Sequence, residues 1–102
     1  MATTVLDELQ QAGTATLSNV SSSASSVTIL AANTARLQAM IFNDSTSVLY
    51  LKFGTTASSS SYTVQLASNA YYELNIPNVY TGKIDGIWAS ANGNARVTEL
   101  TA

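Results

Sequence analysis

Residues 81–100 read TGKIDGIWASANGNARVTEL and contain the only Trp of this 102-residue chain. Ile84, Gly86 and Trp88 occupy every second position, which is the period of a β-strand whose two faces meet different surroundings. Asn92-Gly93 can adopt positive φ at both central positions of a type I′ turn. We therefore predict a β-hairpin, with Gly86 leaving room for a neighbouring side chain. The stretch holds no paired nucleophile and base and no set of metal ligands, so it predicts a fold but no chemistry.

Upstream of the predicted hairpin, alternating stretches recur about every ten residues, the spacing typical of an antiparallel sandwich or barrel. We expect strands at residues 27–30, 36–42, 48–53, 62–66 and 72–76, the last two adjacent. Residues 55–61 should form a loop that no large side chain anchors. The predicted fold class is all-β, an antiparallel β-sandwich or flattened barrel of about six to eight short strands.

The first 25 residues are predicted to be an N-terminal arm, followed by a β-domain over residues 26–102. Residues 3–13 fit a short helix, and residues 14–26 are too small and polar to bury much surface. The latter are either a disordered tail or an arm that orders on binding. One face of the helix would expose a small apolar cluster that needs a partner, made of Val5, Leu6 and Leu9.

Charged residues make up only 10% of the chain, against about a quarter in average domains. The formal net charge is −2 with four cationic residues, which leaves no basic patch for a phosphate backbone, so no direct nucleic-acid partner is expected. Cys and His are absent, which removes disulfides, thiolates and histidine bases. No apolar run approaches the roughly 18 residues of a membrane span, so no membrane partner is expected.

The candidate sites favour contact rather than catalysis. The carboxylates are scattered and the many serines lack a base, so we expect no enzyme activity, no cofactor and no metal. Trp88 is expected in the core, although four aromatic residues suit a sugar-binding platform if they are exposed together: Tyr50, Tyr71, Tyr80 and Trp88. Assembly contacts are predicted on the outward strand faces at Met40, Phe42, Tyr50 and Tyr71, and in the arm at Val5, Leu6 and Leu9.

Four stretches carry a resemblance to a known group. They are NDSTSVLYLKFG (residues 43–54), SSSYTVQLA (59–67), AYYELNIP (70–77) and GIWASANGNARVTEL (86–100). In this order they resemble small structural proteins of tailed bacteriophages and prophages, of the capsid decoration or head-fibre type, over residues 26–100. The resemblance implies a non-enzymatic virion protein, assembled in the host cytoplasm, that binds the major capsid protein or another virion protein.

A small domain with a neutral, partly apolar exterior gains by covering it, so we expect a symmetric homo-oligomer. We expect a trimer, which the resemblance to phage decoration proteins also implies. A second hypothesis is a carbohydrate-binding β-sandwich module used for adhesion to a host surface, in a fibre or near the tail. Low charge and the predicted arm favour the first hypothesis, whereas only the aromatic residues favour the second.

Overall fold

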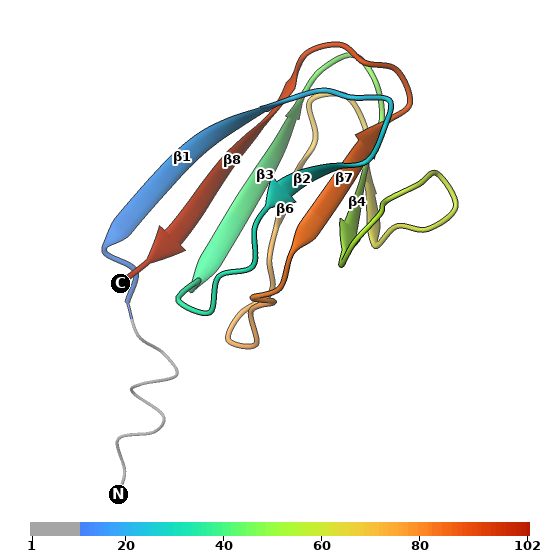
Figure 1. Cartoon of the computed structure of the whole chain (residues 1–102). Coiled ribbons are helices and arrows are strands. Elements are labelled where there is room, and N and C mark those ends of the chain that lie inside the picture. The colour runs from blue at the N-terminus through green and yellow to red at the C-terminus, as the bar shows by residue number, and fades with distance from the viewer. Residues whose placement is uncertain (1–10) are drawn as a thin grey trace, which may run out of the picture.

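The computed structural model describes residues 11–102, which form β-strands and loops and contain no helix. The strands are β1 (Thr14–Ser21), β2 (Val27–Leu30), β3 (Gln38–Asp44), β4 (Leu49–Phe53), β5 (Val64–Leu66), β6 (Tyr71–Glu73), β7 (Ile84–Trp88) and β8 (Asn94–Thr101). They build a first sheet in the order β1-β8-β3-β6 and a second sheet in the order β2-β7-β4-β5 (Figure 1). Every strand pair in both sheets is antiparallel, so the predicted all-β sandwich is confirmed.

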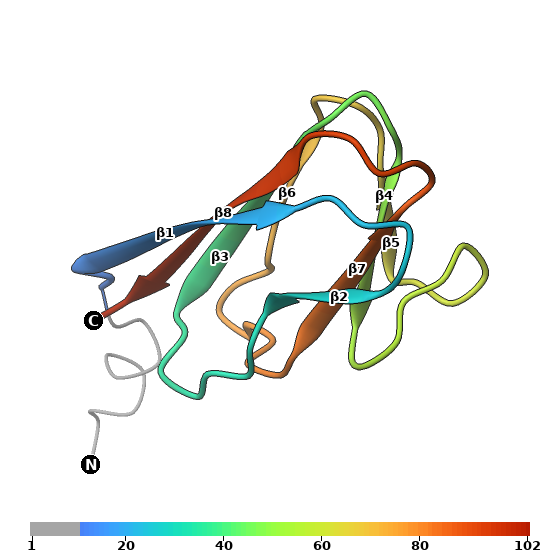
Figure 2. The ribbon, with the colours of Figure 1, turned by 45° about the horizontal axis from the view of Figure 1, so that its top comes forward.

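The strand pairing is nested along the chain. β1 pairs with β8, β2 with β7, β3 with β6 and β4 with β5. In addition, β3 pairs with β8 and β4 pairs with β7. This is the strand order of a jelly roll, in which two Greek keys fold into a double sheet. Figure 2 shows the consequence, because the chain passes from one sheet to the other at nearly every connection.

The predicted C-terminal hairpin is wrong. β7 lies between β2 and β4 in the second sheet, whereas β8 lies between β1 and β3 in the first. Gly93 has a positive φ of 72° but Asn92 does not, so the connection is not a type I′ turn. β5 and β6, expected to be adjacent, also lie in different sheets. Turn residues show that the chain reverses, but the burial of each strand's apolar face decides which sheet it joins.

The core fills the space between the inner faces of the two sheets. Ile41 and Val97 from the first sheet and Leu51 and Trp88 from the second are each at most 2% exposed, which confirms that Trp88 is a core residue. Gly86 has the predicted role, because a Cβ at this position would lie 2.7 Å from Ile29 Cγ1. The strand order thus brings residues from the whole described chain around one core.

β1 corrects the expected N-terminal arm. Thr14–Ser21 is paired with β8 along its full length, so the first sheet begins well before residue 26. Only Val20 in this strand is partly buried, and the other seven residues are exposed. Because neither face is buried, the strand has no alternation of apolar and polar residues that sequence reasoning could detect. The predicted helix falls almost entirely outside the described residues, as do Val5, Leu6 and Leu9.

The serine-rich connection between β4 and β5 is a loop, as predicted, and hydrogen bonds hold both of its ends. The backbone N–H of Thr56 donates to Asp85 Oδ2 at 2.7 Å, and that of Ala57 donates to Ser26 Oγ at 2.9 Å. Lys52 Nζ donates to Ser61 Oγ at 2.8 Å. Backbone amides at the start of the loop and the Lys52 ammonium at its end hold it in place, whereas no large apolar side chain does.

Candidate functional site

The outer face of the first sheet brings together three of the predicted contact residues. Met40 and Phe42 lie two residues apart on β3, and Phe42 is the register partner of Tyr71 on β6. Tyr71 is 61% exposed, while Met40 and Phe42 are partly buried between neighbouring strands. We call Met40, Phe42 and Tyr71 the outer patch. Its side chains project from regular strands, so their relative positions are fixed by the sheet.

The same face continues onto β1, where sequence reasoning placed no contact residue. Thr98 on β8 is the register partner of both Leu17 and Met40, so these two apolar side chains lie in one row across the sheet. Leu17 is 74% exposed. A shallow hollow of about 260 Å³ lies beside it, lined by residues of β1 and β8. Leu17 was missed because it falls in the stretch that was expected to be an arm.

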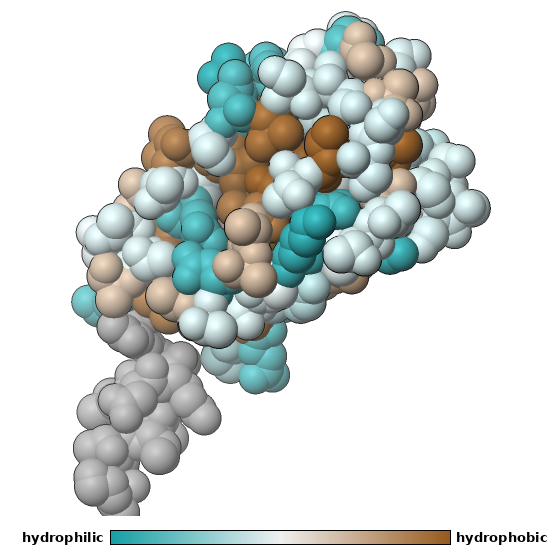
Figure 3. All heavy atoms as spheres, viewed as in Figure 1, coloured by the Kyte–Doolittle hydropathy of each residue, from teal (hydrophilic) through white to brown (hydrophobic). Residues whose placement is uncertain are grey.

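Figure 3 shows where apolar side chains reach the surface on one side of the molecule. They gather in the middle of the view, where Figure 1 places β2, β3 and β8, and polar groups surround them. β1 and β2 are edge strands of the two sheets, and Val20 and Val27 on these strands are only partly buried against the core. The sandwich is therefore less completely covered beside β1 than in its centre.

Tyr50 lies on the opposite side of the sandwich from the outer patch. Tyr50 lies between the buried residues Leu49 and Leu51 on β4, so its side chain points to the outer face of the second sheet. There its ring centroid is 5.0 Å from that of Tyr62. The four aromatic residues considered for a sugar platform are therefore not gathered. Trp88 is 2% exposed, and Tyr80 is stacked on Phe53 at a centroid distance of 4.5 Å. The platform hypothesis is thus wrong for this set of residues.

Two buried polar side chains organise the ends of the sandwich. Arg36 is 1% exposed. Its guanidinium donates to Glu99 Oε2 at 2.7 Å and to three backbone carbonyls, those of Ala31, Tyr80 and Gly82. Arg36 therefore ties the β2–β3 and β6–β7 connections to β8, and its charge is not available to a ligand.

Asn43 organises the other end of the sandwich. Its Nδ2 lies within 3.1 Å of the carbonyl oxygens of Ser47, Leu66 and Ala67. Its Oδ1 accepts from Ser45 Oγ at 2.7 Å and from Trp88 Nε1 at 3.2 Å. Asn43 matches the glycosylation pattern Asn-Asp-Ser, but it is fully buried and its amide is fully used. Its role in this structure is to hold the core and two loops together.

The carboxylates of the described residues do not form a metal centre. No group of three or more His, Cys, Asp or Glu side chains occurs within residues 11–102. Asp44, Asp85 and Glu99 each face a cation instead, namely Arg96, Lys83 and Arg36 respectively. Asp85 is 4% exposed. Its Oδ1 forms no hydrogen bond but lies 3.3 Å from Lys83 Nζ. Its Oδ2 accepts a hydrogen bond from the backbone N–H of Thr56 in the serine-rich loop. These acids have structural partners.

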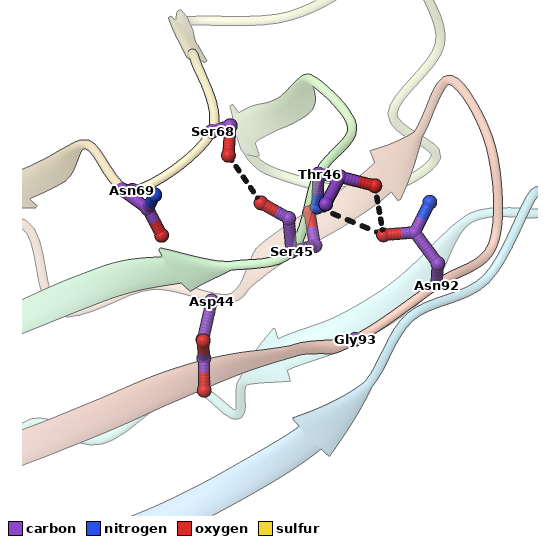
Figure 4. Close-up of a pocket in the computed structure, with 7 residues that line it drawn as sticks. All are labelled: Asp44, Ser45, Thr46, Ser68, Asn69, Asn92 and Gly93. Carbon is purple, nitrogen blue, oxygen red and sulfur yellow. Dashed lines mark hydrogen bonds between the residues drawn. The ribbon is translucent and has the colours of Figure 1, made fainter.

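A polar pocket of about 300 Å³ lies at the loop end of the sandwich (Figure 4). Three connections contribute to it, those between β3 and β4, β5 and β6, and β7 and β8. Its lining consists of Asp44, Ser45, Thr46, Ser68, Asn69, Asn92 and Gly93. Thr46 donates twice to Asn92 Oδ1, at 2.8 and 2.9 Å, and Ser68 Oγ donates to the Ser45 carbonyl at 2.6 Å. Several of the polar groups that line the pocket are thus already hydrogen-bonded to one another.

No family model, curated protein or solved structure matches this chain in comparisons with known proteins. Within residues 11–102, no helix has the length and apolar character needed to cross a membrane.

Proposed function

We propose that this protein is a non-enzymatic structural component of a tailed-phage virion, of the capsid decoration or head-associated type. It binds the major capsid protein or another virion protein and stabilises the particle surface. It is present in the virion, after assembly in the host cytoplasm, as a homo-oligomer. The observation that carries this proposal is the outer patch, in which Met40, Phe42 and Tyr71 present an apolar and aromatic surface on a rigid sheet.

The composition of the outer patch suits protein–protein contact. Aromatic residues and Met are enriched in interfaces between proteins, and charged residues are depleted in their centres. Arg96 on β8, the register partner of Phe42, is paired with Asp44 at 2.7 Å. Glu73 on β6 is the register partner of Met40 and is exposed, so one negative charge lies beside the outer patch. An exposed apolar group on a regular sheet can bind without first being ordered, which lowers the entropic cost of association. The resemblance over residues 26–100 then supports a virion protein as the partner.

The outer patch can be tested by binding to particles that lack the protein. The double variant Phe42→Ser with Tyr71→Ser removes two rings from the outer patch, whereas Tyr50→Ser removes one ring from the opposite face. Truncating central aromatic residues of an interface typically costs about 2 kcal/mol or more each, so the double variant should lose most particle binding. Tyr50→Ser should bind like the wild type. Loss of binding in Tyr50→Ser alone would place the interface on the second sheet and reject the outer patch.

A carbohydrate-binding module is the second candidate, and the polar pocket is the observation that favours it. Its carboxylate, amide and hydroxyl groups are of the kind that bind sugar hydroxyls, and jelly rolls occur in lectins as well as in viral capsids. We rank it second because Asn92, Thr46 and Ser68 already bond within the pocket. Glycan binding by the isolated protein that is lost in Asn69→Ala but retained in Asn78→Ala, an exposed site outside the pocket, would favour this candidate.

A further inference from the structure

β1 lies at the edge of the first sheet among the described strands. Eight consecutive register pairs, from Thr14↔Thr101 to Ser21↔Asn94, join it to β8. No strand of the described residues pairs with its other side, and Figures 1 and 2 both show that side without a neighbouring strand. In an antiparallel ladder, alternate residues direct their N–H and C=O groups to opposite sides. About half of the backbone groups of β1 therefore point towards this open edge.

The other edges of the two sheets are less suited to pairing. β5 and β6 are three residues long, and the pairing of β2 with β7 contains a register shift between Thr28 and Leu30. Short strands and bulges are two of the features by which natural sheets avoid edge-to-edge association. β1 has eight residues in uninterrupted register. It is the one edge among the described strands that offers a long regular ladder.

The sequence around β1 also lacks the residues that normally protect an edge. Residues 11–35 contain no charged residue and no Pro. Lys and Pro on edge strands prevent association with another chain. Leu17, near the middle of β1, is 74% exposed. An uncharged edge can approach an identical edge without repulsion, which is the requirement for pairing with a second copy.

We propose that β1 pairs antiparallel with β1 of a second copy, about a two-fold axis at Leu17. The first sheets of both copies then form one continuous eight-stranded sheet. Leu17 lies opposite Leu17 of the second copy, and Thr16 lies opposite its Ser18. Apolar pairs and Thr–Ser pairs are favourable across antiparallel strands. Such an isologous contact is the commonest way in which identical chains associate.

The proposed pairing also places the two outer patches together. A two-fold axis perpendicular to the sheet reverses the strand direction but keeps the same face upward. Both outer patches therefore lie on one side of the dimer, and a particle can bind them at the same time. Two linked contacts bind more strongly than one when the geometry allows both to form. The dimer itself does not depend on the proposed function.

The test is sedimentation velocity over a range up to high micromolar concentration. Wild-type protein should sediment as a dimer. Leu17→Lys and Leu17→Glu should each weaken dimerisation by about tenfold or more, because like charges would face each other across the axis. An equimolar mixture of the two variants should regain dimers. Ile76→Lys makes the same chemical change at a 65% exposed position outside the strands and should dimerise like the wild type.

The possible outcomes separate this proposal from the alternatives. A monomeric wild type would overturn it, and so would a trimer, which would favour the three-fold association implied by the resemblance. Equal dimerisation of Leu17→Lys and Ile76→Lys, or no recovery in the mixture, would move the contact away from β1. Melting curves establish that each variant is folded. The Phe42→Ser and Tyr71→Ser double variant should still dimerise, so failure of the particle contact is distinguishable from failure of the β1 contact.

Discussion

At the scale of single residues, buried polar side chains contribute as much to the design of this sandwich as its apolar core. Asn43 is fully buried on β3 and connects Trp88 to the backbone of two loops. A buried polar group that loses its partners costs about 1–3 kcal/mol, so a fully satisfied network favours one arrangement of the surrounding loops. The position of Trp88 in the core is therefore defined by a hydrogen bond as well as by packing.

Replacing Asn43 by Asp tests this network with almost no change in shape. The new oxygen cannot donate unless it is protonated, and it would face the carbonyl oxygens of Ser47, Leu66 and Ala67. We expect Asn43→Asp to lower the free energy of unfolding by roughly 2–4 kcal/mol. Asn78→Asp makes the same change of charge at an exposed position and should be nearly neutral. Denaturant unfolding followed by Trp88 fluorescence measures both, and equal losses of stability would refute the role of Asn43.

The sequence predicted the apolar part of the core but not its polar part. The alternation in residues 48–53 and the face shared by Ile84, Gly86 and Trp88 both correspond to buried positions. Arg36 and Asn43 could not be predicted in the same way. Several of their partners are carbonyl groups far away in the chain, those of Tyr80 and Gly82 for Arg36 and those of Leu66 and Ala67 for Asn43, and no local pattern in the sequence records such partners.

At the scale of elements, the strands were easier to predict than their neighbours. A strand appears in the sequence through alternation along itself, whereas the order of strands depends on which inner faces pack together. β7 and β8 show the difference, since both were predicted as strands but belong to opposite sheets. β1 shows the converse, because a strand with two exposed faces has no alternation and is recognised only through its pairing with β8.

Two N-terminal deletions test the place of β1 in the fold. Removing residues 1–10 leaves all eight strands intact and should keep the melting temperature near that of the full chain. Removing residues 1–21 also removes β1, which leaves β8 as an edge strand and uncovers the side of Val97. This larger deletion should lower the melting temperature markedly or prevent folding. Equal effects of the two deletions would contradict the assignment of residues 14–21 to the sheet.

At the scale of the whole molecule, the two outer faces of the sandwich differ. The first sheet carries the outer patch and the open edge of β1, while the serine-rich loop folds against the second sheet and buries Asp85. The predicted contact residues were spread over both faces, because parity along one strand cannot show which sheet that strand will join. The structure assigns Met40, Phe42 and Tyr71 to one face and Tyr50 to the other. The assembly surface that we propose therefore lies on the first sheet.

The proposed role of this protein in the virion is tested by its amount in purified particles. Tailed-phage particles released by the host that carries this sequence would be purified by density gradient and digested for quantitative mass spectrometry. If the protein decorates the particle, its peptides should follow the particle band in many copies, at a fixed ratio to the major capsid protein. Its absence from the particle band, with recovery only in the particle-free fraction, would contradict a structural role in the virion.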